Sequence, residues 1–193
     1  RVTFDTAFAD VMRACADRDS TWITADIFRV YNRLHELGYA HSVEVWVDDR
    51  LAGGLYGIHL GGAFFAESKF HRVTDMSKVA VVSLARHMHQ RGLALLEVQY
   101  LTEHLSQFGV IEVPHAEYLK LLEAALRLHR MAEGMPQVEQ GAAAVVAFKI
   151  LKTLPGDHHG GEAGDHVAQE PLALGRLAGS LGAVLVVLDS GQG

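Results

Sequence analysis

Apolar residues at helical spacing fill the first part of the chain. An amphipathic helix is predicted to begin near Asp5, because apolar residues recur there every three or four positions: Phe4, Phe8, Val11, Met12 and Cys15. A second helix is predicted to be capped by Thr24 or Asp26 and to end at Gly38. Its apolar face is expected to carry Ile27, Val30, Tyr31 and Leu34.

Strict alternation of apolar and polar residues comes next and predicts a β-hairpin. Residues 41–47 place Val43, Val45 and Val47 on one face of a strand. Residues 48–50 are expected to form the turn, and residues 51–60 return as the partner strand.

Glycines interrupt the second strand of that hairpin. Gly53, Gly54 and Gly57 weaken a strand intrinsically, so we expect them to mark a bulge or a close approach by a ligand or another backbone. Residues 61–62 then turn the chain into a third strand that is predicted to end near Phe65.

The pattern up to residue 130 predicts an α+β fold. Helices and strands are expected to alternate: a helix from Asp75 or Ser77 to Arg91, a strand over 93–98, a helix over 102–108, a strand over 110–113 and a helix from 114 to about 130. Two helices before an antiparallel hairpin, followed by this alternation, predict a mixed, mainly antiparallel sheet flanked by helices. Residues 131–193 include a Gly/His-rich stretch and are predicted to be a C-terminal extension of unknown role, partly disordered.

Composition narrows the class of protein. The 193 residues carry 17 Lys and Arg against 23 Asp and Glu, and this net charge of −6 argues against a protein that coats nucleic acid through bulk charge. Cys15 is the single cysteine, so no disulfide can form within the chain and a reducing, cytoplasmic compartment is expected. No apolar run approaches the ~20 residues of a membrane span, and no signal peptide follows Arg1. We expect a chain that begins inside something longer.

Most familiar catalytic and cofactor motifs are missing from the sequence. It has no P-loop, no G-x-G-x-x-G after a strand and no nucleophile elbow. His87 and His89 lie two apart on a predicted helix and cannot face one ligand, while His158, His159 and His166 are more typical of a solvated loop. No metal is expected.

Three polar residues stand out against this apolar background. Glu67 follows Phe64 and Phe65 and is equally compatible with a carboxylate at the mouth of an apolar cleft or an acid at a helix start. Glu97 and Gln99 are two apart on a predicted buried strand, hence on one face, where they need partners. Either a reaction site or a structural hydrogen-bond network would meet that need.

These residues belong to a pattern that resembles the leucyl/phenylalanyl-tRNA-protein transferases. The resemblance spans residues 1–127 and rests on Thr21-Trp-Ile23, Tyr31-Asn-Arg-Leu-His-Glu-Leu-Gly38, Ala40-His-Ser-Val-Glu-Val-Trp46, Gly53-Gly-Leu-Tyr-Gly57, Phe64-Phe-Ala-Glu-Ser-Lys-Phe70, Ser77-Lys78, Gln99, His104-Leu105 and Gly109. It implies an acetyltransferase-like (GNAT-type) domain that corresponds to the C-terminal part of those enzymes. In the family a tRNA-contacting domain precedes it, and that domain is expected to be absent before Arg1 here.

The resemblance also implies an activity and a set of site residues. Such enzymes are cytoplasmic and move Leu or Phe, with Met left open, from aminoacyl-tRNA to the α-amino group of a protein that starts with Arg or Lys, which marks that protein for degradation. A monomer is expected, with no metal and no cofactor beyond the aminoacyl-tRNA. Gln99 and Glu97 are implied at the reaction centre, and the following residues around the amino acid and terminal adenosine: Trp22, Leu55, Phe64, Glu67, Leu84 and Leu96.

The sequence departs from the family pattern at three positions, two of which are implied site residues, and two other functions stay open. Glu97, Lys69 and Leu84 stand where members usually carry Asp, Met and an aromatic residue. An N-acyltransferase of the same fold that uses acyl-CoA is one alternative, although no pyrophosphate loop of the usual kind is present. An inactive module that binds N-terminal Arg or Lys is the other.

Overall fold

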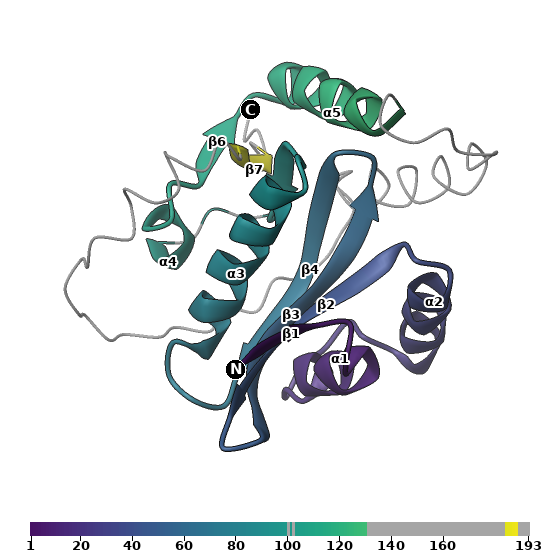
Figure 1. The fold of residues 1–193 in the computed structure, drawn as a ribbon, viewed down its shortest axis with the longest axis vertical. Helices are drawn as coiled ribbons and strands as arrows, with labels where there is room; N and C mark the ends of the chain where they lie inside the picture. The colour runs from purple at the N-terminus through teal and green to yellow at the C-terminus, as the bar shows by residue number, and fades with distance from the viewer. Residues whose placement is uncertain (100, 102, 131–183, 189–193) are drawn as a thin grey trace.

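The computed structural model describes residues 1–99, 101, 103–130 and 184–188, and within these the backbone alone at 104, 128–130 and 184–188. One mixed sheet runs through this part of the chain, with strand order β1-β2-β3-β4-β5-β7-β6 (Figure 1). Its strands are β1 (Val2–Phe4), β2 (Ala40–Val47), β3 (Arg50–Leu60), β4 (Ala63–His71), β5 (Leu95–Glu97), β6 (Ile111–Val113) and β7 (Val184–Leu188). Its helices are α1 (Phe8–Ala16), α2 (Ala25–Glu36), α3 (Met76–Gln90), α4 (Glu103–Ser106) and α5 (His115–Arg130).

The sheet is antiparallel on one side and parallel on the other. β1 to β4 pair antiparallel in sequence order, whereas β4 with β5, β5 with β7 and β6 with β7 pair parallel. The predicted α+β class is therefore confirmed. The extension beyond residue 130 lies outside the described residues apart from β7, which pairs between β5 and β6.

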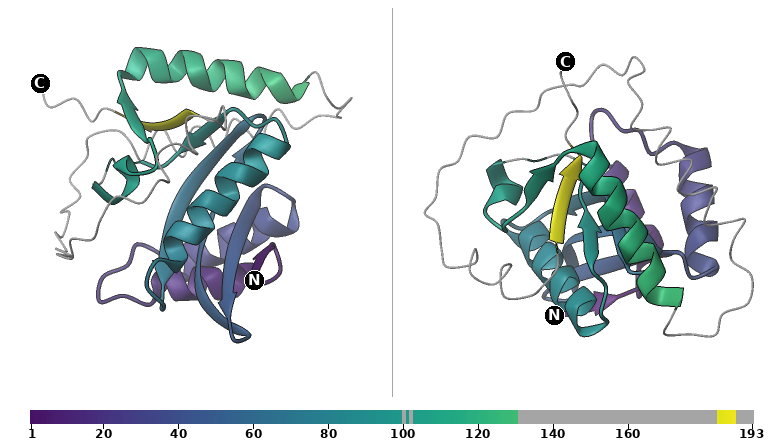
Figure 2. Two further views of the ribbon diagram at one scale, coloured as in Figure 1. Left: turned by 60° about the vertical axis from the view of Figure 1, so that its left-hand side comes forward. Right: turned by 90° about the horizontal axis from the view of Figure 1, so that it is seen from above.

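Helices cover both faces of the sheet (Figure 2). α3 packs on one face, where a core cluster joins Val43, Leu55, Phe64, Leu84 and Leu96. α1, α2 and α5 contribute to the cluster on the opposite face, with members such as Met12, Tyr31, Phe65 and Leu122. Phe64 and Phe65 thus point to opposite faces, as neighbouring strand residues must.

The beginning of the chain differs from the sequence prediction. Val2–Phe4 is a strand paired with β2, and the helix starts only at Phe8. Phe4 belongs to the α3 side of the sheet and is not on the first helix. In α2 the Thr24 hydroxyl accepts a hydrogen bond from the Ile27 N–H at 3.3 Å, so the predicted cap is confirmed. Val30 is 55% exposed, so its assignment to the buried face was wrong.

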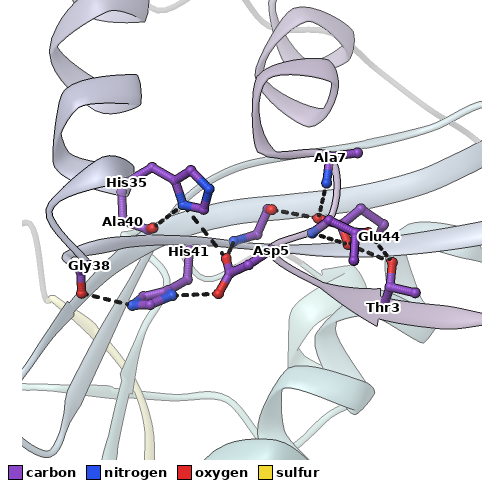
Figure 3. A network of polar contacts seen from close by, with 10 residues as sticks. Thr3, Asp5, Ala7, His35, Gly38, Ala40, His41 and Glu44 are labelled. Atoms are coloured by element: carbon purple, nitrogen blue, oxygen red, sulfur yellow. Dashed lines mark hydrogen bonds and ion pairs between the residues drawn. The ribbon is translucent and has the colours of Figure 1, made fainter.

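A polar network fastens β1 and the start of α1 to β2 and the end of α2 (Figure 3). The buried Glu44 carboxylate accepts hydrogen bonds from the hydroxyls of Thr3 at 2.6 Å, Thr6 at 2.8 Å and Ser42 at 2.5 Å. Burial of a carboxylate is costly unless donors surround it, and these donors supply that compensation.

Asp5 forms the second half of the same network. Its carboxylate accepts from the Ser42 N–H at 2.9 Å and lies 2.8 Å from Nδ1 of His41 (Figure 3). Nε2 of His41 lies 3.1 Å from the Gly38 carbonyl oxygen. Both ring nitrogens therefore face acceptors, an arrangement that favours the doubly protonated imidazolium.

The β2–β3 hairpin is confirmed, and its glycines have the predicted cause. Asp48 and Asp49 both have positive φ, which is typical of a two-residue type I′ turn. A Cβ at Gly53 would lie 2.6 Å from the Met76 Cβ, so the start of α3 approaches the strand there. The ladder between β3 and β4 also shifts register at Tyr56/Gly57, which places a bulge where one was expected.

Candidate active site

Glu97 and Gln99 meet at the point where β5 ends. The strand stops at Glu97, and Gln99 takes a φ of 60°, so the chain turns instead of continuing as a strand. The Gln99 N–H donates to Oε1 of Glu97 at 2.8 Å. A turn rather than a shared strand face brings the two residues together, which corrects the sequence-based reasoning. A non-glycine residue at positive φ is strained, and such residues cluster at functional sites.

Glu67 is the extra residue of the bulge in β4. Tyr56 pairs with Ser68 and Gly57 pairs with Ala66, so Glu67 has no partner position in β3. The residue lies inside a nine-residue strand, which excludes the interpretation of Glu67 as a helix-start acid. A bulge re-aims the side chain that it carries. Here Oε2 of Glu67 accepts a hydrogen bond from the Gln99 side-chain amide at 3.2 Å.

The three polar residues therefore form one connected set, which we call the Glu67–Gln99–Glu97 set. Glu67 and Glu97 are 7% and 2% exposed. β4 pairs with β5 only from Ala63 to Phe65, so Glu67 lies just past the place where the two strands part. Two carboxyl groups and an amide thus gather at a break in the sheet, where backbone pairing does not fill the space between strands.

Aromatic residues adjoin this set on the α1–α2 face. Tyr31 is buried, and its pKa is raised by burial and then by the nearby charges of Glu67 and Tyr56. Its ring meets the rings of Tyr56 at 5.4 Å and Trp22 at 6.2 Å, both edge-on. Trp22 is 39% exposed. Tyr31 and Tyr56 were not predicted as site residues. A tyrosine on an otherwise apolar face could have indicated them, because its hydroxyl needs a polar partner when the ring is buried.

Four of the apolar residues that the resemblance implies for the site lie on the opposite face of the sheet, under α3. Leu55, Phe64, Leu84 and Leu96 are each 4% exposed or less and belong to the cluster under α3. Trp22 touches the opposite cluster through Tyr31. The structure therefore brings Leu55, Phe64, Leu84 and Leu96 together, but it places Trp22 on the other face of the sheet.

Lys69 follows Glu67 by two residues in β4 and is half-buried. Burial, and then the charge of Arg18, lower the pKa of Lys69. The Arg18 guanidinium donates to the Lys69 carbonyl oxygen at 2.6 Å and to the Ser68 hydroxyl at 3.1 Å. Arg18 thus binds β4 at the two residues that directly follow the bulge.

Other nucleophile and metal candidates lie apart from this set. Cys15 is buried, and burial raises the pKa of its thiol to about 12, so it is a core residue and not a reactive thiol. The His87 ring stacks on Phe4 at 4.3 Å. The part of the chain that the structure describes holds no group of three or more His, Cys, Asp or Glu able to bind a metal ion. His158, His159 and His166 lie outside it.

Sequence comparison decides the family. The family model described as leucyl/phenylalanyl-tRNA protein transferase matches residues 1–123, well over half of the chain. The chain belongs to this family. Every residue of the Glu67–Gln99–Glu97 set lies inside the matched region, as do Trp22, Tyr31 and Tyr56.

Curated members of the leucyl/phenylalanyl-tRNA protein transferase family are close in sequence. The transferase of Gloeobacter violaceus is 54% identical over 127 residues, covering 66% of this chain and 66% of the relative. That of Salinibacter ruber is 58% identical over 125 residues, covering 65% and 55%. That of Ruegeria pomeroyi is 46% identical over 146 residues, covering 76% and 69%. The chain thus spans just over half to about two thirds of the length of these relatives.

Proposed function

We propose that this chain carries the transfer site of an aminoacyltransferase, which moves Leu or Phe from aminoacyl-tRNA to the α-amino group of a protein that begins with Arg or Lys. The observation that carries the proposal is the buried Glu67–Gln99–Glu97 set within a domain of this family. Met as a further donor residue, and the marking of the product for degradation, belong to the same proposal.

Aminoacyl transfer mainly requires the protein to hold the ester and the amine in the correct relative position. The amine nitrogen bonds to the ester carbonyl carbon, the bond from that carbon to the ribose oxygen breaks, and one amine proton ends on the ribose oxygen. An aminoacyl ester is already activated, so attack geometry and the handling of one proton are the main demands.

The contacts of Gln99 support a role for it in meeting these demands. Its side-chain nitrogen donates to Glu67, so its amide oxygen faces away from that carboxylate and can accept a hydrogen bond from the attacking amine. Glu97 fixes the turn by accepting the Gln99 backbone N–H. We assign Gln99 as the catalytic residue that touches the amine and Glu97 as the carboxylate that positions it.

The two carboxyl groups also fit a cationic acceptor. Glu67 and Glu97 are both buried, and a buried carboxylate is stabilised by an opposite charge. A protein that begins with Arg or Lys carries a side-chain cation close to its α-amino group, so both groups can reach the two carboxylates. In this proposal Trp22 and Glu67 contact the terminal adenosine, and Leu55, Phe64, Leu84 and Leu96 shape the apolar part of the amino-acid site from behind the sheet.

The decisive test is transfer of labelled Leu from Leu-tRNA to a peptide that starts with Arg. The wild-type protein should transfer the label, and Gln99→Ala should lower kcat/KM by about 100-fold or more. Gln107→Ala, which shortens an exposed glutamine outside the set, is the matched control and should keep full activity. Full activity in Gln99→Ala would remove Gln99 from its role.

The same assay separates the alternatives. If acetyl-CoA acylates the peptide while Leu-tRNA does not, the protein is an acyl-CoA-dependent N-acyltransferase. If the full-length protein binds the peptide and neither donor reacts, the protein is a binding module for N-terminal Arg or Lys.

Three further properties complete the proposal. We expect activity without metal or cofactor other than the aminoacyl-tRNA, a monomer, and a cytoplasmic location. Among the described residues, no helix combines the length and the apolar character needed to span a membrane.

A further inference from the structure

A hollow of about 510 Å³ lies between α1, α2 and the residue that follows β4. We call it the α1–α2 hollow. Ile23 and Phe28 supply apolar surface, Arg13 and Arg72 supply two cations, and Asp17 and Thr24 supply oxygen atoms. The volume falls in the range of small-ligand sites, about 300–1,000 Å³. None of these residues belongs to the Glu67–Gln99–Glu97 set.

Both arginines of the hollow are held in place by aromatic rings. The Arg13 guanidinium lies 5.4 Å from the centre of the Phe28 ring and donates to Asp10 at 2.7 Å. The Arg72 guanidinium lies 5.6 Å from the centre of the Phe70 ring and donates to the Leu51 carbonyl oxygen at 3.3 Å. Each guanidinium has five N–H donors, so donors remain for a ligand in both.

The hollow and the Glu67–Gln99–Glu97 set lie on the same face of the sheet. Ile23 and Thr24 follow Trp22 directly, and the Trp22 ring meets Tyr31, whose pKa responds to Glu67. Arg72 follows Glu67 by five residues, and a strand rises ~3.3 Å per residue, so the two lie roughly 16 Å apart along β4. Trp22 is therefore linked to both sites, through its ring contact with Tyr31 and through the two lining residues that follow it, and it is 39% exposed.

We propose that the α1–α2 hollow binds one nucleotide of the single-stranded 3′ end of the tRNA donor, adjacent to the terminal adenosine. The inference rests on the proposed function, because it takes the donor to be aminoacyl-tRNA. The base packs on Phe28 and Ile23, Arg13 and Arg72 bind the phosphate, and Asp17 accepts a hydrogen bond from a ribose hydroxyl. Single-stranded RNA is commonly bound by this combination of apolar or aromatic surfaces and arginines.

Asp17 distinguishes a nucleotide from a simple anion. A carboxylate on the rim repels phosphate or an acidic peptide, but it is a good acceptor for the 2′-hydroxyl of a ribose. The apolar residues Ile23 and Phe28 likewise make no favourable contact with inorganic phosphate. A ligand with an apolar ring, a hydroxyl and one negative charge matches the whole lining, and a nucleotide unit of RNA has all three.

The test measures equilibrium binding, so that it does not depend on transfer. Adenosine and the trinucleotide cytidyl-cytidyl-adenosine are titrated into the wild-type protein by calorimetry. The trinucleotide should bind about tenfold more tightly than adenosine, which is the effect expected of one stacked base. A trinucleotide that contains 2′-deoxycytidine should lose part of this advantage.

Variants assign the advantage to the hollow. Arg13→Gln combined with Arg72→Gln should abolish the trinucleotide advantage and leave the affinity for adenosine unchanged. Arg33→Gln is the matched control, since Arg33 is an exposed arginine on α2 that pairs with Glu36 and does not line the hollow. The control should bind both ligands like the wild type.

Two results would overturn the inference. One is equal affinity of the wild type for adenosine and the trinucleotide; the other is an undiminished trinucleotide advantage in the double variant. If instead the double variant binds the Arg-starting peptide more weakly, the hollow serves the acceptor and the nucleotide assignment is wrong. A protein that binds the trinucleotide as expected but transfers nothing would contradict the proposed function alone.

Discussion

Gly57 shows how a single residue positions the site. It stands opposite the bulge in β4, where a Cβ would come within 2.2 Å of the Phe65 carbonyl oxygen and 2.4 Å of the Phe64 ring. Only glycine lets the two strands approach so closely at this point. The bulge that aims Glu67 at Gln99 therefore depends on the missing side chain of a residue that touches neither.

Gly57→Ala should destabilise the protein by at least about 2 kcal/mol, because the added methyl group overlaps backbone and ring atoms that cannot move independently. The free energy of unfolding in urea measures this loss. Gly92→Ala is the control: its Cβ meets nothing within 4 Å, so only the cost of a φ of 71°, about 1–2 kcal/mol, applies. A smaller loss for Gly57→Ala than for Gly92→Ala would contradict the steric argument.

The residue scale is also where sequence reasoning was least complete. Glu67, Glu97 and Gln99 could be singled out as polar residues in apolar surroundings, but the contacts between them could not. The link depends on the positive φ of Gln99 and on the bulge at Glu67, and neither follows from residue type. Tyr31 was assigned to a core face, which is correct, while its proximity to Glu67 could be found only in the folded structure.

Among the elements, β4 illustrates why some boundaries could be predicted and others could not. The alternation of Val43 and Val45 follows the pleat of β2, so that strand was found at nearly its full length. In β4 the extra residue Glu67 breaks the period of two, so the pattern stopped near Phe65 although the strand runs to His71. β1 has only three residues and merged with the apolar spacing of α1.

The junction of β1, α1 and β2 should make stability depend on pH. The hydrogen bond with Asp5 raises the pKa of His41 above its ordinary 6.5 in spite of burial, so folding favours the protonated ring. Burial alone would raise the pKa of Asp5, but the hydrogen bonds from His41 and Ser42 hold it below its ordinary 3.8. The His41 contribution is complete below pH 6.5 and is lost as the pH rises through the folded-state pKa. The Asp5 contribution is complete above pH 3.8 and is lost as the pH falls.

His41→Gln should therefore cost most stability in the window between these two values. We expect the difference in free energy of unfolding between wild type and His41→Gln to be largest near about pH 5 and to shrink toward about pH 8. Urea unfolding at both pH values measures it. His89→Gln, at an exposed position on α3, should show no comparable trend. A difference that grows with pH would refute the charged pair.

At the scale of the whole molecule, β7 connects the far end of the chain to the site. Leu95, Leu96 and Glu97 of β5 pair with Val184, Leu185 and Val186, and β7 in turn pairs with β6. Glu97 is thus held from one side by β4 and from the other by β7. The C-terminal extension, predicted without a role, thus contributes a strand next to Glu97.

A chain shortened after residue 130 should be less stable than the full chain. It lacks β7, so β5 and β6 expose unpaired edges, and each lost ladder hydrogen bond costs about 0.5–1.5 kcal/mol. Urea unfolding and size-exclusion chromatography should show a lower midpoint and aggregation. Removal of residues 189–193 alone, which leaves β7 intact, is the control. An unchanged midpoint in the chain that ends at 130 would show that β7 adds nothing to the sheet.

The position of β7 also sets the order in which the protein can be completed during synthesis. Parallel pairing joins Leu95 to Val184, so the partner of β5 is made long after β5 itself. Contacts between such distant residues form slowly, because a long loop must close first. With ribosomes adding roughly 5–20 residues per second, the strands β1 to β4 can assemble seconds before the β5 edge is covered. Glu97 therefore gains its second flanking strand long after its first, because β4 is made just before β5 and β7 only about 90 residues later.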